Sequence, residues 1–256
     1  MSGRFVWHEL MTTDPKGAMA FYSHVVGWKT EPFPDSVGPE PYTMWVGSQG
    51  PIGGVMTLPD DAKKMGAPPH WMGNIDVPDL DAAVAKVKQL GGKIFVPPMA
   101  IPKVGRVSVI ADPQGASVSL FQPEQAMKPH DTDKQGEISW NELITSDAPA
   151  ATKFYAAVCG WKVLDEMDMG PAGKYYLYGG DKAYGGMMTK TPDMPMPPTW
   201  VYYIQVDDLD AAIARANEKS AKLMVGPMDV PGGTRVAQLT DPQGAHFALH
   251  GPGKGK

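Results

Sequence analysis

The sequence predicts an α+β chain that contains two tandem copies of one domain, and three observations support this fold class. The chain has 256 residues, a length that favours two ordinary domains because single domains most often have about 100–150 residues. The first half of the sequence recurs in the second half. Within each copy, strand-like runs and amphipathic helical stretches follow one another in the same order twice.

The repeat is the strongest of these observations. Ten residues between Trp7 and Lys29 recur at a separation of 133, beginning with Trp140, and self-similarity at a fixed spacing indicates duplicated structural units. Further on the separation falls to 129, as from Trp71 to Trp200, which indicates a loop of different length. A polar stretch with prolines, typical of a linker, lies between the copies. We therefore predict a first domain at 1–122, a linker at 123–136 and a second domain at 137–251.

Each copy divides once more into two modules, each consisting of a strand, a helix and three further strands. Helices are expected at Asp14 to Gly27 and at Asp79 to Gly92, because each stretch begins with an Asp that can cap a first turn and ends at a Gly that can adopt the left-handed conformation. Short apolar runs between Gly and Pro breaks predict the strands of the first copy. They lie at 5–11, 43–46, 53–58, 71–77, 94–96, 106–110 and 116–121.

Composition is that of a soluble globular protein. Apolar residues make up 43% and charged residues 20%, close to the usual averages. A net charge of −5 provides no basic field for a nucleic acid, and no apolar run is long enough to span a membrane. Cys159 has no partner for an internal disulfide, which favours a reducing compartment. The N-terminal residues from Met1 to Glu9 lack the apolar stretch of a targeting signal, so we expect a cytoplasmic protein.

Three motifs occur at matching spacing in both copies. In the first copy they are the opening Thr-Asp-Pro…Phe-Tyr…Gly-Trp at 13–28, the helix start Asp-Leu-Asp-Ala-Ala at 79–83 and the closing Asp-Pro-Gln-Gly at 112–115. In the second copy the same motifs lie at 146–161, 208–212 and 241–244. The second opening has Ser in place of Thr and Ala in place of Pro. With these motifs the chain resembles the vicinal oxygen chelate superfamily of glyoxalases, bleomycin-resistance proteins and dioxygenases. The doubled Trp-x-Glu-Leu openings most resemble its bacterial two-domain glyoxalase-like proteins. The resemblance implies that each pair of modules forms a cup-shaped mixed sheet.

In enzymes of this superfamily the first and last strands of the modules supply metal ligands, and the resemblance places four such positions in each copy. They fall on Trp7, Val55 or Met56, Met72 and Ser119, and on Trp140, Met187 or Met188, Val201 and Ala248. None of these side chains offers the imidazole or carboxylate that a divalent metal prefers. We therefore expect neither a metal ion nor a cofactor. The alternative is a shifted register in which His8, Glu9 and His70 hold a metal, although a lone strand histidine is more often a hydrogen-bonded or surface residue.

Glu9 and Glu142 are the candidate catalytic residues. Side chains alternate along a strand, so Glu9 shares a face with Trp7, and Glu142 shares a face with Trp140. Burial of a carboxylate beside an indole raises its pKa, which suits a general base or a contact to the polar end of a ligand. In the alternative interpretation each Glu is a structural residue, tied to the backbone or to the nearby arginine of its own copy.

Further side chains complete the predicted ligand-binding set. The set consists of Trp7, Met56, Met72, Tyr42 and Arg106 in the first copy, with Trp140, Tyr175 and Arg235 in the second. Flexible thioethers and aromatic rings suit an irregular apolar ligand, although methionines equally fill ordinary cores.

These observations predict a protein that binds a small, partly apolar organic molecule in one or both cups and exists as a monomer or homodimer. The alternative is an enzyme of the same superfamily, either a lyase, an isomerase or a dioxygenase. Such an enzyme would depend on a metal held by displaced ligands or would use a Glu base without a metal. In a third interpretation the cups are fully packed and the protein acts through its surface.

Overall fold

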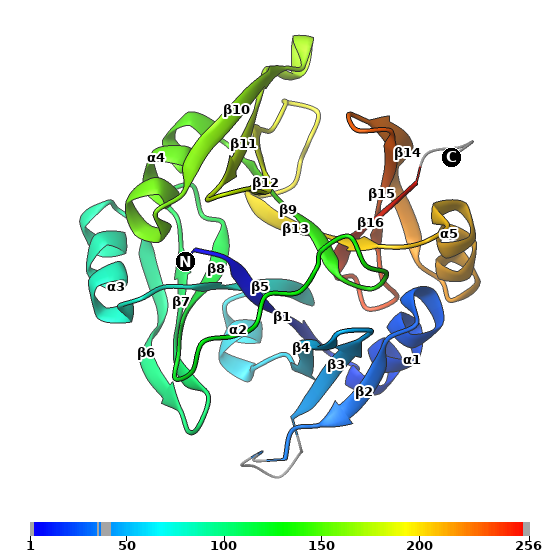
Figure 1. The fold of residues 1–256 in the computed structure, drawn as a ribbon, viewed down its shortest axis with the longest axis horizontal. Helices are drawn as coiled ribbons and strands as arrows, with labels where there is room; N and C mark the ends of the chain where they lie inside the picture. Colours follow the sequence, from blue (N-terminus) through cyan, green and yellow to red (C-terminus); the bar gives the residue numbers. More distant parts are fainter. Residues whose placement is uncertain (1–2, 35, 37–41, 253–256) are drawn as a thin grey trace. The chain divides into compact units, whose positions relative to one another are not determined.

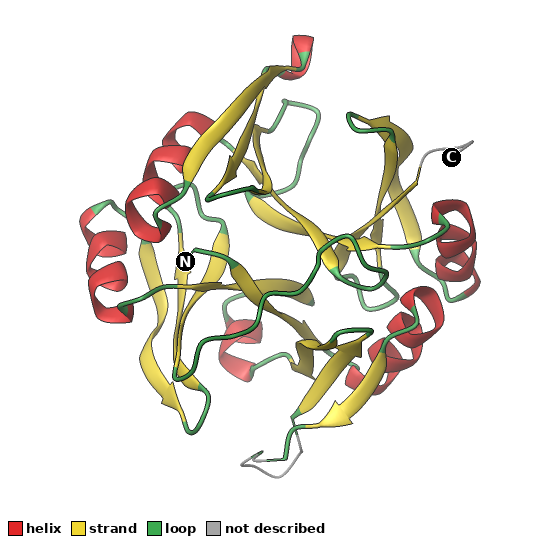
Figure 2. Ribbon diagram, in the orientation of Figure 1, coloured by secondary structure: helices red, strands yellow, loops and turns green. Residues whose placement is uncertain are grey.

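The computed structural model describes residues 3–34, 36 and 42–252. Met1 and Ser2 of the predicted N-terminal segment lie outside these ranges. Strands make up most of the regular structure, and the helices between them are short (Figure 2). In the described ranges, no helix has both the length and the apolar character needed to cross a bilayer.

Four modules of a strand, a helix and three strands follow one another along the chain, as the sequence predicts (Figure 1). The first consists of β1(Phe5–Thr12), α1(Pro15–Val26), β2(Lys29–Pro32), β3(Thr43–Gly47) and β4(Gly50–Thr57), followed by the short α2(Asp60–Lys64). The second consists of β5(His70–Asp76), α3(Leu80–Gln89), β6(Lys93–Ile101), β7(Gly105–Ala111) and β8(Ser117–Pro123).

The second repeat has the same order of elements. Its first module consists of β9(Ile138–Thr145), α4(Ala148–Cys159), β10(Lys162–Asp168), β11(Lys174–Gly179) and β12(Ala183–Thr189), with a 3₁₀ turn at Gly170–Ala172. Its second consists of β13(Thr199–Gln205), α5(Leu209–Glu218), β14(Lys222–Val230), β15(Thr234–Thr240) and β16(His246–Pro252).

The strands form two eight-stranded mixed sheets, which confirms the predicted α+β class. Their strand orders are β2-β3-β4-β1-β5-β8-β7-β6 and β10-β11-β12-β9-β13-β16-β15-β14. In each repeat the first strand of a module runs parallel to its last strand, while the remaining pairs within a module are antiparallel. The parallel pairing of β1 with β4 aligns Glu9 with Gly54, and this register positions the site described below.

Local sequence signals explain where the helices begin and end. Asp14 accepts a hydrogen bond from the backbone N–H of Gly17 at the start of α1, and Gly27 ends the helix with a φ of 82°. Asp79 caps α3 in the same way. The predicted stop of this helix is corrected by one residue, because the left-handed position is Gly91, with a φ of 84°, rather than Gly92.

The chain forms two compact units, and each unit combines one module from each repeat. Unit 1 consists of Met1–Val6, Met72–Pro129 and Trp140–Val201, and unit 2 consists of Trp7–Trp71, His130–Ser139 and Tyr202–Lys256. Within unit 1, α3 packs beside α4, and within unit 2, α1 packs beside α5 (Figure 1). The domain boundaries expected from the sequence stay a prediction.

Each unit has a core of aromatic rings. In unit 2, Tyr22 contacts the rings of Trp28, Trp45, Trp71 and Phe247. Buried aromatic pairs add to the stabilisation from their burial, so these rings fix the position of α1 against the strands around it.

Candidate functional site

Glu9 lies on β1, and its carboxylate faces the same side of the strand as the indole of Trp7. The indole N–H of Trp7 lies 3.3 Å from Glu9 Oε2, which is at the long end for a hydrogen bond. The alternation of side chains along a strand accounts for this proximity, because residues two apart share a face.

Tyr42 completes the group that we call the Glu9 site, which consists of Trp7, Glu9 and Tyr42. The hydroxyl of Tyr42, the residue before β3, donates to Glu9 Oε2 at 2.6 Å. The indole N–H of Trp7 donates to the same hydroxyl at 2.8 Å. The structure thus brings together three of the residues that the sequence singled out, and the direction of donation runs from indole to phenol to carboxylate.

Gly54 makes room for this contact. It lies beside Glu9 on the neighbouring strand and opposite Met44 on β3. A Cβ atom at Gly54 would collide with the hydroxyl of Tyr42 and lie 2.8 Å from Glu9 Oε1. Gly54 is not among the predicted site residues, although its pair with Gly53 recurs at 185–186 and is the sequence signal for it.

The two carboxylate oxygens of Glu9 have different surroundings. Oε2 receives both donors, whereas Oε1 is buried and has no hydrogen-bond partner among the described residues. Burial raises the pKa of Glu9 from 4.5 to about 7, against the lowering effect of the hydrogen bonds from Tyr42 and Trp7. Glu9 can therefore accept or release a proton near neutral pH, which is a property of general bases.

The second repeat contains a matching group in unit 1, the Glu142 site, which consists of Trp140, Glu142 and Tyr175. Trp140 Nε1 donates to the Tyr175 hydroxyl at 2.9 Å, and that hydroxyl donates to Glu142 Oε1 at 2.8 Å. Gly186 aligns with Glu142, and a Cβ atom there would collide with the ring of Tyr175. Burial and the charge of Glu142 raise the pKa of Tyr175, so this phenol keeps its proton.

The two candidate methionines lie in different surroundings. Met56 on β4 is half-buried and aligns with Met11 on β1, two residues beyond Glu9, so it shares the face of the Glu9 site. Met72 on β5 is 6% exposed and belongs to unit 1.

The two arginines have acidic partners of their own, which corrects the interpretation that they hold the glutamates. Arg106 binds Asp81 through two hydrogen bonds of 2.7 and 3.0 Å. Arg235 donates to Asp210 at 2.8 Å. In both modules the arginine stands at the start of a strand and the aspartate in the first turn of the module's helix, so the pair joins helix to sheet. Sequence reasoning missed this pairing because it depends on how the helix packs on the sheet.

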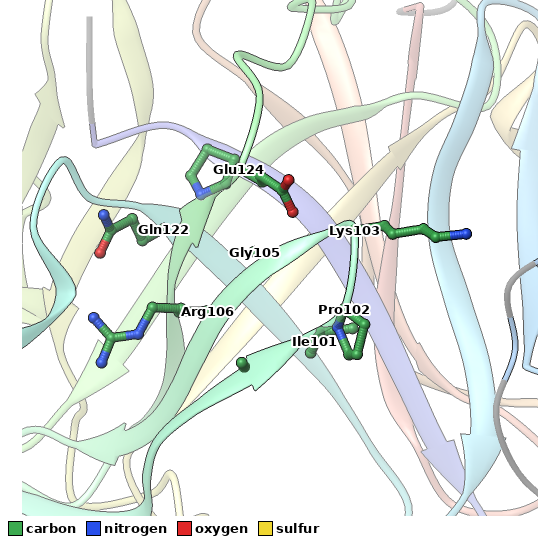
Figure 3. Close-up of a pocket in the computed structure, with 9 residues that line it drawn as sticks. Ile101, Pro102, Lys103, Gly105, Arg106, Gln122 and Glu124 are labelled. Carbon is green, nitrogen blue, oxygen red and sulfur yellow. The ribbon is translucent and has the colours of Figure 1, made fainter.

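Arg106 also lines a groove of about 280 Å³ at one end of the β6–β7 hairpin. Figure 3 shows that Lys103 and Arg106 extend in opposite directions, so their charges do not converge on one point. The groove is also lined by Pro102, Gln122 and Glu124, which are labelled in the same figure. A ligand site normally combines an apolar cavity with a few converging polar groups. The polar groups of the Glu9 site converge on one another, whereas those of this groove do not.

The side chains that the structure describes do not suit a divalent metal. Among the described residues, no three His, Cys, Asp or Glu side chains form a group that could hold one. The shifted-register histidines have other contacts. The ring of His8 lies edge-on to Tyr202 at 5.0 Å, and His70 Nδ1 is 2.7 Å from the carbonyl oxygen of Pro68. At the positions implied by the resemblance, the indole N–H of Trp7 donates a hydrogen bond to Tyr42. Ser119 carries a buried hydroxyl with no hydrogen-bond partner within the described ranges.

Comparison with known proteins places this arrangement among relatives. The family model of the Glyoxalase/Bleomycin resistance protein/Dioxygenase superfamily matches residues 4–120 and 137–249. The chain is 36% identical over 249 residues to "Putative glyoxylase CFP32" of Mycobacterium bovis, which covers 96% of this chain and 94% of the relative. It is 28% identical over 257 residues to "Anthracycline biosynthesis protein DnrV" of Streptomyces peucetius, with 96% and 92% covered.

Solved structures share the fold. The 2,3-dioxygenase LapB from Pseudomonas sp. KL28 aligns with a TM-score of 0.66 at 12% identity, covering 99% of this chain and 94% of that chain. The Mn(II)-bound glyoxalase from Novosphingobium aromaticivorans aligns with a TM-score of 0.63 at 15% identity, covering 98% and 81%. At these identities the likeness concerns the fold, and function has to be argued from the side chains.

Proposed function

The chain belongs to the glyoxalase/bleomycin resistance protein/dioxygenase superfamily, and from this premise we propose that it binds a small, partly apolar organic molecule at the Glu9 site and at the Glu142 site. In this proposal the ligand is held by protein side chains rather than through a metal ion. The proposal includes a cytoplasmic location, a monomeric or homodimeric state and no nucleic-acid partner.

The observation that carries the proposal is Oε1 of Glu9, which is buried and finds no hydrogen-bond partner in the described part of the chain. Leaving a buried acceptor without a partner costs about 1–3 kcal/mol, and more for a charged group. A bound molecule that displaced the neighbouring side chains and donated a hydrogen bond to Oε1 would remove this penalty. Most buried side-chain polar atoms have at least one hydrogen-bond partner, and Oε1 of Glu9 shares this exception with Oε1 of Glu137.

The surroundings favour a ligand with an apolar body. The carboxylate of Glu9 lies beside the indole of Trp7. On the same face of the sheet are the half-buried thioethers of Met11 and Met56. Two relatives are named as anthracycline biosynthesis proteins, and anthracyclines are aromatic compounds. These names support an aromatic molecule as a candidate ligand.

A second candidate function is catalysis with Glu9 as general base. It is favoured by the pKa of Glu9, which burial raises to about 7, since a base works best when its pKa is near the working pH. In this alternative the same residue takes a proton from the bound molecule. Chemical change of a bound compound, lost in Glu9→Gln while binding persists, would identify this function.

Binding can be tested with freshly purified protein and the neutral apolar dye Nile red. We expect native mass spectrometry to show a co-purifying organic molecule, and we expect saturable binding of the dye. Loss of an aromatic anchor costs about 1–3 kcal/mol, so Trp7→Ala and Trp140→Ala should each remove one class of dye site. The double variant, checked for folding by circular dichroism, should bind no dye. Unchanged dye binding by the folded double variant would contradict the proposal and favour a protein that acts through its surface.

A further inference from the structure

The hydrogen bonds of the Glu9 site join two oxidisable rings to one proton acceptor. The indole N–H of Trp7 donates to the Tyr42 hydroxyl at 2.8 Å, and that hydroxyl donates to Glu9 Oε2 at 2.6 Å. Indole and phenol rings are among the side chains that lose one electron most readily. The site therefore has the parts of a chain that carries an electron in one direction and a proton in the other.

Glu9 is placed to take the proton of an oxidised Tyr42. Loss of an electron makes a phenol strongly acidic, so its oxidation near neutral pH is easiest beside a base. Burial raises the pKa of Glu9 from 4.5 to about 7, so its carboxylate holds a proton more tightly than an ordinary one. Burial and the charge of Glu9 also raise the pKa of Tyr42, so the phenol keeps its proton until it is oxidised. At 2.6 Å the proton can cross without movement of the two oxygen atoms.

Burial favours the oxidised pair over the resting one. In the resting pair a neutral phenol faces a charged carboxylate, and in the oxidised pair a neutral phenoxyl radical faces a neutral carboxylic acid. A buried site disfavours the charged form, and Oε1 of Glu9 has no hydrogen-bond partner among the described residues to compensate. Oxidation thus removes a poorly solvated charge, which makes Tyr42 easier to oxidise than a tyrosine in water.

We propose that Trp7, Tyr42 and Glu9 form a redox-active relay, in which a one-electron oxidant in solution oxidises the indole and Tyr42 then reduces the indole radical cation. The O–H bond of Tyr42 breaks and its proton forms an O–H bond with Glu9 Oε2. A one-electron reductant returns the electron to the phenoxyl radical, and Glu9 returns the proton. Trp7 is half-buried, so an oxidant such as a metal complex or a peroxyl radical can approach it. This activity goes beyond the proposed function and needs no bound ligand.

The Glu142 site has the same order of groups, with contacts of 2.9 Å from Trp140 to Tyr175 and 2.8 Å from Tyr175 to Glu142. We expect a second relay there. Experiments on the Glu9 site are therefore made in a Tyr175→Phe background, which removes the phenol of the second site.

The test generates tris(bipyridine)ruthenium(III) by a laser flash at about pH 8, where the Glu9 carboxyl is ionised. We expect the tryptophanyl absorption to decay while the narrow tyrosyl band appears, with the tyrosyl radical also visible by electron paramagnetic resonance. Formation of the tyrosyl radical should be slower in D₂O, because a proton moves in the same step. Ascorbate should restore the resting protein.

Two substitutions in this background locate the radical. Tyr42→Phe should lose the tyrosyl signal and keep the tryptophanyl signal. Glu9→Gln keeps the size of the side chain but removes the base, so it should have the same effect. The matched control is Tyr176→Phe on β11, which is half-buried and whose side chain points to the opposite face of the strand from residue 175. This variant should keep the tyrosyl signal.

The outcomes separate this inference from the proposed function. A tyrosyl signal unchanged in Tyr42→Phe or in Glu9→Gln overturns the relay, and so does equal formation in H₂O and D₂O. The isotope comparison uses a protein that retains Tyr42 and Glu9, so it decides the question even where Glu9→Gln does not fold. Saturable binding of Nile red without a tyrosyl signal leaves the proposed function standing and overturns the relay. A tyrosyl signal without dye binding does the reverse.

Discussion

Two opposing effects act on the carboxylate of Glu9. The hydroxyl of Tyr42 approaches Oε2 to 2.6 Å, a distance typical of charge-assisted hydrogen bonds, which favour the ionised form. Burial disfavours that form, and it is the larger effect because the pKa of Glu9 ends at about 7. At the residue scale, the carboxylate of Glu9 is thus buried and has one oxygen without a hydrogen-bond partner among the described residues.

Replacement of Glu9 by Gln should make stability less dependent on pH. The pKa of Glu9 is raised from 4.5 to about 7 in the folded state, so the folded protein binds a proton more tightly than the unfolded chain does. Stability is then fully present below about pH 4.5 and falls as the pH rises through about 7, by up to about 3 kcal/mol. Glu9→Gln has no charge to bury, so its unfolding free energy should exceed that of the parent by about 1–3 kcal/mol at pH 8 and differ little at pH 4.5.

Urea unfolding at the two pH values measures this difference. The control is Glu31→Gln on β2. The side chain of Glu31 is exposed and stays in water in both the folded and the unfolded state, so this substitution should not change how the unfolding free energy depends on pH. A parent and a Glu9→Gln variant with parallel pH profiles would show that Glu9 is not desolvated.

At the scale of elements, the Asp-Pro-Gln-Gly turns connect the repeats within each unit. Asp112 Oδ1 accepts from the backbone N–H groups of Gln114, Gly115 and Ala116, and its Oδ2 accepts from the hydroxyl of Tyr155 on α4. In unit 2 the hydroxyl of Tyr22 on α1 donates to Asp241. One carboxylate thus orders a turn before the last strand and fixes a helix from the other repeat.

A double-mutant cycle should reveal this pairing. Asp112→Ala leaves buried donors without an acceptor and should cost about 3 kcal/mol of unfolding free energy. Tyr155→Phe should cost about 1–2 kcal/mol. The effects of the two substitutions should fall short of additivity by about 1 kcal/mol, because they remove one shared hydrogen bond. Urea unfolding of both single variants and the double variant provides the values.

The matched control for this cycle combines Asp112→Ala with Tyr22→Phe. Tyr22 donates to Asp241 in unit 2, so these two substitutions should be additive. Equal coupling in both cycles would contradict the pairing of each tyrosine with its own aspartate.

Sequence patterns were sufficient to predict where helices and strands lie, and insufficient to predict which side chains of different elements contact one another. The caps at Asp14 and Gly27 are local, so the bounds of α1 could be predicted. The alternation along β1 placed Glu9 with Trp7 for the same reason. The contact of Tyr42 with Glu9 depends on the pairing of β3, β4 and β1 and on the space that Gly54 leaves. Sequence periodicity carries no such long-range information, which is also why Asp81 was not recognised as the partner of Arg106.

At the scale of the whole molecule, each compact unit draws on both repeats. Within unit 2, Trp28 Nε1 donates to the carbonyl of Gly136 at 2.7 Å. Within unit 1, Trp161 Nε1 donates to the carbonyl of Gly3, and Lys86 Nζ donates to the carbonyl of Ala157 at 3.0 Å. The contacts that hold a unit together therefore join segments that are far apart in the sequence.

Cleavage of the predicted linker should leave the protein assembled. A protease site inserted between the exposed residues Met127 and Lys128 would divide the chain into its two repeats. Both units contain segments from each fragment, so the fragments should co-elute on size exclusion at the size of the uncut protein. In urea they should separate. Separate elution under native conditions would show that each repeat is stable by itself.

The combination of segments from both repeats in each unit also determines which part of the chain would be needed to transfer the Glu9 site to another protein. The unit that contains it is built mainly from 7–71 and 202–256, which lie at opposite ends of the chain. A circular permutant opened in the linker and joined by a flexible peptide at the present termini would make these two segments consecutive. That rearranged gene, rather than either half of the present one, would encode the main segments of unit 2 in one continuous stretch.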